Sequence, residues 1–148
     1  MQDGIAVQGH IEVIEHDATT GAELSRYRGP NRVVNTGLDM IADRLRQNSG
    51  IGGASLYALG TNSTPPVAGN TALLAEAFRG TLTATRVSAG ELTMTMFLGS
   101  TQGNGITFKE GGAFNAENTL LCRAVFPDKA KTSSKTLTIL HTIPITAS

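Results

Sequence analysis

The histidines and the single cysteine are the side chains of this chain best suited to metal binding or nucleophilic chemistry. His10 and His16 fall on one face of an expected strand, because side chains alternate along a strand, and Glu12 lies between them. A metal site needs further ligands that converge on the ion, and a single strand does not supply them at this spacing. We interpret this face as solvated or interfacial, and we predict neither a metal site nor a cofactor.

Cys122 and His141 both lie among apolar residues of expected strands. A lone cysteine in such a strand is expected to be a small buried hydrophobe, and the histidine a hydrogen-bonded core or interface residue. Nucleophilic catalysis needs a base beside the nucleophile and a group that orients the base, and no such motif surrounds either residue. Serine-elbow, metalloprotease, redox-cysteine and dinucleotide-binding motifs are missing too. We therefore predict that the protein is not an enzyme. Glycosidase-type carboxylate pairs, which form only in space, stay open.

The composition is typical of a β-rich protein that assembles. The formal net charge is zero, which indicates no nucleic-acid or acidic-membrane partner and gives little self-repulsion. Charged residues make up 16% of the chain, below the usual value of about a quarter. Residues 1–8 are expected to form an N-terminal arm and residues 9–148 a single domain. We find no signal peptide or membrane-spanning stretch, so we expect synthesis in a reducing cytoplasm.

The stretch 106–126 has the pattern of a hairpin around which the other strands are organised. Two extended runs are joined by a polar turn at residues 115–118. Gly111 and Gly112 interrupt the first run, where we expect a bulge or the close approach of another backbone. Apart from Arg123, both faces of the second run are apolar. This strand is therefore predicted to lie inside a sandwich or against a neighbouring chain.

One helix is expected, from Thr36 to about residue 46. Thr36 is predicted to be its N-cap, with Asp39 completing a shortened capping box, and residues 48–50 to end it. The helical spacing predicts an apolar face that packs on the sheets, formed by Leu38, Ile41, Ala42 and Leu45. This helix is expected to cover an open end or edge of the sheets.

The remaining strands are expected in hairpins separated by turn residues. Residues 29–31 are predicted to break the second strand, residues 61–70 and 128–135 to form loops, and residues 72–78 to be weakly helical or extended. Pro144 cannot donate a ladder hydrogen bond, so the last strand is expected at an edge. The expected strands cover residues 10–16, 23–28, 54–60, 81–87, 91–98 and 136–146. Together these elements predict a mainly β fold, an antiparallel β-sandwich of jelly-roll type with one short α-helix.

Three stretches carry a likeness to a known group of proteins. The segment KEGGAFNA at residues 109–116 leads to LCRAVFP at 121–127, a Lys/Ser/Thr turn and a Thr-rich last strand. NRVVNTGL at 31–38 runs into IADRL at 41–45, and YALGT at 57–61 runs into NTAL at 70–73. In these features most of the chain resembles virion structural proteins of tailed bacteriophages, which include head-decoration and tail-fibre proteins.

The resemblance implies a non-enzymatic virion component made in the host cytoplasm. We expect a capsid decoration or cement protein, a homotrimer that binds the major capsid protein or other virion proteins and stabilises the head shell. The alternatives are a tail-fibre, collar or tail-tip adaptor, or a carbohydrate- or receptor-binding sandwich that uses Tyr27 and Tyr57. The candidate assembly contacts come from the arm, the proline-containing loop, the lysine-rich loop and the last strand: Ile5, Val7, Pro65, Pro66, Lys129, Lys131, Lys135 and His141.

Overall fold

The chain is mainly β with one helix, as predicted. The structure, a computed structural model, describes residues 5–7, 9–46 and 52–147. Within these ranges the elements are β1 (Ile5–Val7), β2 (Gly9–Asp17), β3 (Glu23–Val33), α1 (Asn35–Leu45), β4 (Ala54–Gly60), β5 (Glu76–Thr81), β6 (Ala84–Ser88), β7 (Glu91–Leu98), β8 (Thr107–Asn115), β9 (Leu120–Ala130) and β10 (Lys135–Ala147).

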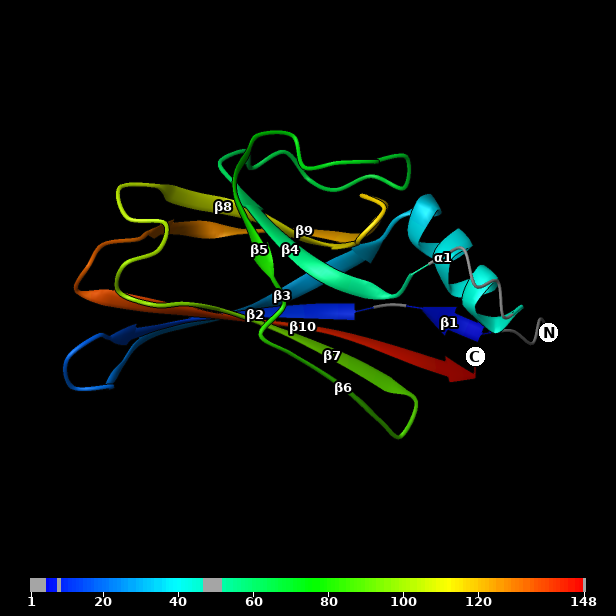
Figure 1. The fold of residues 1–148 in the computed structure, drawn as a ribbon, viewed down its shortest axis with the longest axis horizontal. Helices are drawn as coiled ribbons and strands as arrows, with labels where there is room; N and C mark the ends of the chain where they lie inside the picture. Colours follow the sequence, from blue (N-terminus) through cyan, green and yellow to red (C-terminus); the bar gives the residue numbers. More distant parts are fainter. Residues whose placement is uncertain (1–4, 8, 47–51, 148) are drawn as a thin grey trace.

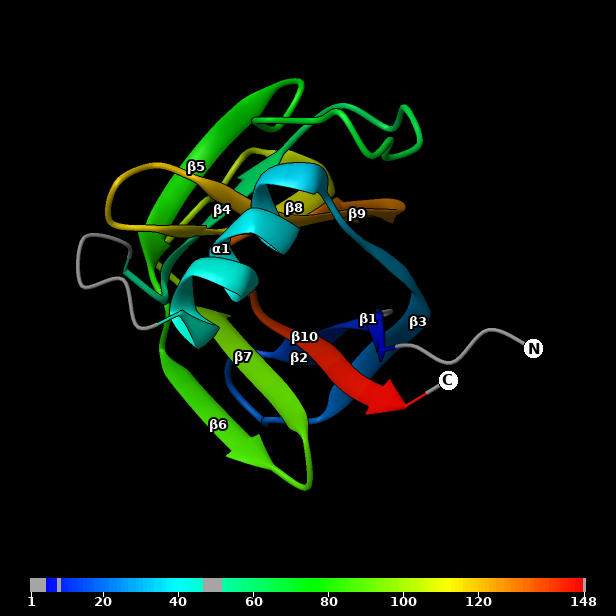
Figure 2. The same ribbon diagram turned by 90° about the vertical axis from the view of Figure 1, so that its right-hand side faces the viewer.

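The strands form one antiparallel sheet that curls into a half-barrel (Figures 1 and 2). The strand order is β5-β4-β8-β9-β3-β2-β10-β7-β6, and β1 pairs with β10. The two end strands, β5 and β6, are consecutive in the chain and are joined by Leu82 and Thr83. The Leu82 amide donates to the Ser55 carbonyl of β4 over 2.9 Å, and the Thr83 amide donates to the Thr95 carbonyl of β7 over 2.8 Å. The chain therefore passes directly from one end of the sheet to the other.

The last strand is predicted at an edge, at least near its end, but most of it lies inside the sheet, and only beyond Pro144 is β1 its single described strand partner. β10 pairs with β2 on one side and with β7 on the other. The ladder with β2 ends at the pair Thr142–His10, and the ladder with β1 begins at the pair Ile145–Val7. Pro144 lies between these two ladders, where the sheet changes partner and a missing N–H donor is tolerated.

The predicted hairpin of β8 and β9 is confirmed, and its glycines mark a close approach. A Cβ atom on Gly111 would lie 2.6 Å from the hydroxyl oxygen of Tyr57. A Cβ atom on Gly112 would lie 2.6 Å from the carbonyl oxygen of Cys122. The register irregularities of this hairpin lie on either side of the glycine pair rather than at it.

Two predicted strand limits near prolines or weak patterns are corrected. β3 runs without interruption to Val33, and Pro30 pairs with His10 of β2. At this point β3 has a strand partner on one side only, an environment in which proline is tolerated. The ambiguous stretch 72–78 is not helical, and its last residues begin β5.

The helix α1 lies at the same end of the half-barrel as β1 (Figures 1 and 2). The prediction of Thr36 as N-cap is wrong. Val34 occupies the cap position without a side-chain hydrogen bond, and the Thr36 hydroxyl instead donates to the Leu120 carbonyl of β9 over 2.7 Å. Thr36 therefore ties the helix to the sheet. The predicted stop at residues 48–50 lies outside the described residues.

The apolar face predicted for α1 is right only at Ile41, which is half-buried and packs against the inner core. The buried residues of the helix are Gly37 and Met40, whereas Leu38 is 44% exposed and Leu45 is 78% exposed. A Cβ atom on Gly37 would overlap the Leu121 carbonyl. The helix thus sits on β9 through its glycine, because only that face allows so close an approach.

Apolar side chains pack on both faces of the sheet around β9. The inner core fills the concave side of the half-barrel and includes Tyr57 and Cys122. A smaller outer core of Val34, Ala58, Leu73, Phe114 and Leu120 lies on the opposite face. Residues 61–75, the connection from β4 to β5 that we call the proline loop, run across this outer face (Figure 1). The apolar outer face of β9 is thus covered by the chain itself.

Candidate functional site

A buried ion pair joins β8 and β9 beneath the proline loop. The Nε atom of Arg123 lies 2.8 Å from Oε2 of Glu110, and both side chains are fully buried. Arg123 Nη1 donates to the Thr64 carbonyl over 2.9 Å. Glu110 accepts hydrogen bonds from the backbone amides of Leu74 and Ala75 over 3.1 and 2.7 Å. Buried charges persist only when they are paired and hydrogen-bonded, so this pair depends on the loop around it.

The same bonds hold the proline loop in one conformation. Loops of this length without secondary structure are usually functional or disordered. Here the Thr61 amide donates to the Ala75 carbonyl over 3.0 Å and closes the ends of the loop, while the ion pair holds its middle. Pro65 is exposed and Pro66 is half-buried. The loop is therefore a fixed wall of the molecule.

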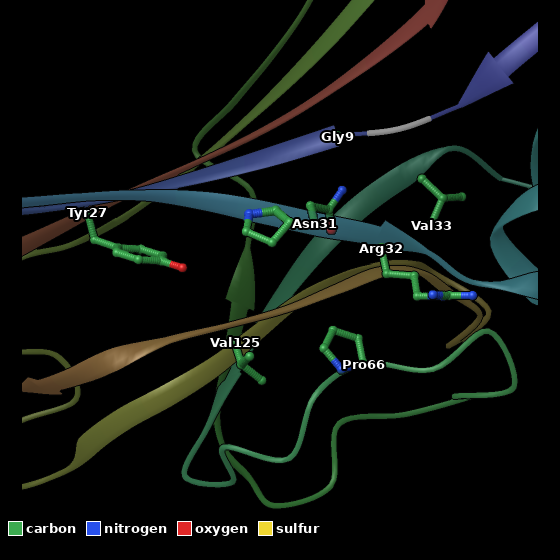
Figure 3. A pocket seen from close by; sticks show the side chains of 8 residues that line it. Gly9, Tyr27, Asn31, Arg32, Val33, Pro66 and Val125 are labelled. Carbon is green, nitrogen blue, oxygen red and sulfur yellow. The ribbon is translucent and has the colours of Figure 1, made fainter.

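A cleft of about 570 Å³ opens between β3 and β9 beside this wall (Figure 3). It exists because the two strands pair only at Arg32–Arg123 and Val33–Cys122, and no further pair of theirs occurs among the described residues. The lining comes from β2, β3, β9 and the proline loop: Gly9, Tyr27, Pro30, Asn31, Arg32, Val33, Val125 and Pro66.

Two polar residues of the cleft are incompletely satisfied. Asn31 is 7% exposed, and neither its Nδ2 nor its Oδ1 atom has a nitrogen or oxygen partner in the described part of the chain. Its amide side chain contacts the sulfur of Cys122, which forms only weak hydrogen bonds. Arg32 is exposed and makes no ion pair with a described carboxylate. The cleft thus offers an amide and a guanidinium to a partner.

Tyr57, His141 and Cys122 form a polar cluster in the inner core. The Tyr57 hydroxyl lies 2.9 Å from His141 Nδ1, and Cys122 Sγ lies 3.8 Å from the same nitrogen. Burial, with a smaller effect of His10, lowers the pKa of His141 to about 3, and burial raises the pKa of Cys122 to about 12. These shifts keep both groups neutral, the opposite of the thiolate–imidazolium pair of a cysteine nucleophile. The geometry therefore supports a structural role for the cluster.

The prediction of an exposed lysine-rich loop at residues 128–135 is wrong. β9 continues to Ala130, and Lys129 and Lys131 are both buried. Lys131 Nζ donates to Asn104 Oδ1 over 2.8 Å, and burial lowers the pKa of this lysine. Asp128, Ala130 and residues 132–134 of the predicted loop are exposed, and Lys135 is half-buried.

Lys129 and Lys135 converge instead on Glu15 of β2. Their Nζ atoms lie 3.4 and 3.2 Å from its carboxylate oxygens, and Lys129 also donates to Ser25 Oγ over 3.1 Å. Burial disfavours ionisation of Glu15, but the Ser25 hydroxyl and Lys135 outweigh this, so the pKa of Glu15 lies below its ordinary value. These side-chain contacts bridge β3 and β9 beyond the cleft.

An apolar groove of about 650 Å³ lies at the end of the half-barrel, between α1 and the strands β6, β7 and β10. Three of its residues are among the most exposed large apolar side chains of the described chain: Leu45 at 78%, Val87 at 76% and Ile145 at 41%. Arg44 of α1 and Glu91 of β7 place charges of opposite sign in its lining. We call this surface the helix-end groove.

The candidate assembly contacts fall in different parts of the molecule. Ile5 and Val7 lie in β1, whose backbone pairs with the end of β10, while the rest of the predicted arm lies outside the described residues. Pro65 and Pro66 lie on the proline loop, and Pro66 lines the cleft. These four residues remain predictions. His141 is fully buried, so it is a hydrogen-bonded core residue as predicted and not a contact.

Glu110 and Asn31 are site residues that the sequence analysis does not identify. Arg123 stood out as the single charge in an apolar run, but its partner Glu110 lies among glycines, where a polar turn was equally plausible. A charge of each sign on two strands of one expected hairpin is the signal that would have suggested the pair. Asn31 was assigned to a strand break, and only the separation of β3 from β9 gives it a role.

Comparisons with known proteins add no relative: no family model, curated protein or solved structure matches this chain. His10 and His16 are half-buried on β2, and the described residues contain no group of three or more His, Cys, Asp or Glu side chains that could hold a metal. Within the same residues, no helix is both long and apolar enough to span a membrane. The cleft and the helix-end groove are therefore the features that bear on function.

Proposed function

We propose that this protein is a non-enzymatic structural component of a tailed-phage particle, a decoration or cement protein that binds the head shell. The helix-end groove supports the part of this proposal that concerns assembly. Its exposed Leu45, Val87 and Ile145 lie together in one apolar depression, and apolar patches of this kind mark protein–protein contacts. The resemblance of the sequence to phage virion proteins supplies the kind of assembly.

The occupant of the helix-end groove that we propose is a second copy of the chain. The resemblance implies a homotrimer, and the exposed apolar side chains of Leu45, Val87 and Ile145 give the groove the character of a contact between copies. We also propose that the curled sheet is a sandwich of jelly-roll type. β3 pairs with β2 along most of its length and with β9 at its end, as a strand that passes from one sheet of a sandwich to the other does.

Light scattering on the purified chain tests this use of the groove. We expect a trimer, and we expect Val87→Asp to shift the mass to that of a monomer while the circular dichroism spectrum is unchanged. Leu24→Asp is the matched control, since Leu24 of β3 is 50% exposed but lies outside the groove. A wild-type monomer at all concentrations, or an oligomer that survives Val87→Asp, contradicts the proposal.

The position on the particle is tested by copy number. Quantitative mass spectrometry of purified virions gives the ratio of this protein to the major capsid protein. A ratio near one to one supports the decoration protein. A handful of copies per particle supports the alternative of a tail-fibre, collar or tail-tip adaptor, and absence from virions overturns both.

The carbohydrate-binding alternative loses one of its two aromatic candidates. Tyr57 is fully buried in the inner core, so it offers no platform to a sugar. Tyr27 remains at the cleft, half-buried. Binding to a glycan array that is lost in Tyr27→Ala would favour this alternative.

A further inference from the structure

The cleft between β3 and β9 differs from the helix-end groove because backbone edges form its walls. β3 pairs with β2 along residues 23–31 but has no described strand on its other side there. β9 pairs with β8 along its length, and its residues 124–130 likewise have no described strand on the side that faces β3. Unpaired strand edges are templates for an added strand. Side chains alone, Ser25 and Lys129, bridge the two strands beyond the cleft.

The side chain at the inner end of the cleft suits a peptide group. Asn31 lines the cleft and is only 7% exposed. Neither atom of its side-chain amide has a nitrogen or oxygen partner among the described residues. Buried amides are rarely left without such partners. A side-chain amide presents one donor and one acceptor side by side, the same pair that a peptide backbone presents.

The charge of the cleft selects the sign of its partner. Arg32 is the single charged residue among the described residues of the lining, and no described carboxylate pairs with it. Figure 3 shows its side chain beside Pro66, near the proline loop. Arg28, two residues before Pro30 on the same strand, is 62% exposed and only 3.9 Å from Glu12. An acidic group bound at the cleft would therefore meet the guanidinium of Arg32, which has no described carboxylate partner, rather than that of Arg28.

We propose that this cleft binds an extended acidic segment of another protein, which adds as a strand along the free edge of β3. The segment's backbone pairs with β3, one of its peptide groups meets the amide of Asn31, and an Asp or Glu side chain pairs with Arg32. Alternate apolar side chains pack against Val33, Val125 and Pro66. The proposal does not rest on the virion role, because it concerns a separate surface.

The test is a selection from a displayed library of random heptapeptides against the immobilised full-length chain. We expect enriched peptides to alternate β-branched with other residues and to carry an Asp or Glu. The enriched peptide is then synthesised with a fluorescent label and its dissociation constant is measured by anisotropy. Arg32→Glu should weaken binding roughly tenfold or more, the loss of one charge-assisted pair. N-methylation of alternate backbone amides should abolish it.

Two variants separate the cleft from general basic attraction. Arg28→Glu, the matched control outside the lining, should change the affinity by less than about threefold, as expected for a rim charge. Val125→Trp should fill the cleft and abolish binding, with folding verified by circular dichroism. No enrichment, enrichment of peptides without acids, or equal losses in Arg32→Glu and Arg28→Glu would overturn the proposal. Selected peptides that match this chain's own N-terminus would replace it with exchange between copies.

Discussion

Two buried polar clusters lie on opposite faces of the sheet, share strand β9 through Cys122 and Arg123, and are stabilised in different ways. On the outer face, Glu110 and Arg123 are a charged pair whose hydrogen bonds reach the backbone of the proline loop. On the inner face, Tyr57 and His141 are bonded over 2.9 Å and are neutral, since burial lowers the pKa of the histidine to about 3. Cys122 and Arg123, neighbours on β9, thus belong to a neutral buried cluster and to a charged buried cluster.

The difference shows what each cluster requires. A buried charge needs several fixed partners, so the outer pair can exist only if the proline loop is ordered over it. A neutral cluster needs fewer partners. Each cluster leaves one buried nitrogen without a hydrogen-bond partner among the described residues, Arg123 Nη2 in the outer cluster and His141 Nε2 in the inner one. The outer cluster should therefore fail when a partner is removed, and the inner cluster when a proton is added.

Removal of one charge of the outer pair should have the largest effect. We expect Arg123→Met to lower the free energy of unfolding by about 3–5 kcal/mol, because the Glu110 carboxylate is left buried without its partner. Urea denaturation at neutral pH measures this. Arg46→Met, which removes an exposed ion pair with Asp43, is the control and should cost less than about 1 kcal/mol. A loss as small as the control's would show that the proline loop is held by other contacts.

Acid should act on the inner cluster. The pKa of His141 is about 3 in the folded chain, below the ordinary histidine value of 6.5, so the unfolded chain binds more protons between these values. Stability is then complete above about pH 6.5 and falls by about 1.4 kcal/mol per pH unit as the pH drops toward 4.5. Urea denaturation across this range should show the slope in wild type and in Tyr57→Phe, which keeps the imidazole. The slope should vanish in His141→Gln, and its persistence there would refute the assignment.

A methyl group between the clusters should have the smallest of the three effects. A Cβ on Gly111 would lie 2.6 Å from the Tyr57 hydroxyl, and Tyr57 is fully buried and bonded to His141. We expect Gly111→Ala to cost about 1–3 kcal/mol, as overpacking does. Gly53→Ala is the control, since no atom of the described residues lies within 4 Å of its Cβ position. Equal thermal stability of the two variants would mean that Tyr57 is not held in place by the glycine.

Most of the local structure could be predicted from the sequence. Alternation predicted β7, the polar turn predicted the β8–β9 hairpin, and the apolar residues around His141 predicted its burial, because these depend on neighbours along the chain. Helical spacing likewise located α1. The same spacing failed to identify the buried face of the helix, since Leu38 and Leu45 are exposed while Gly37 contacts β9.

The contacts between distant segments could not be predicted from the sequence and follow from the tertiary structure. Lys129 and Lys131 belong to a sequence typical of an exposed turn, yet Glu15, Ser25 and Asn104 lie where they can satisfy buried ammonium groups. Pro144 suggested an edge, but the change of partner from β2 to β1 accommodates it within the sheet. Local propensity describes a residue's own segment. The side chains that neutralise, cover or leave open that segment come from elsewhere in the chain, and only folding brings them together.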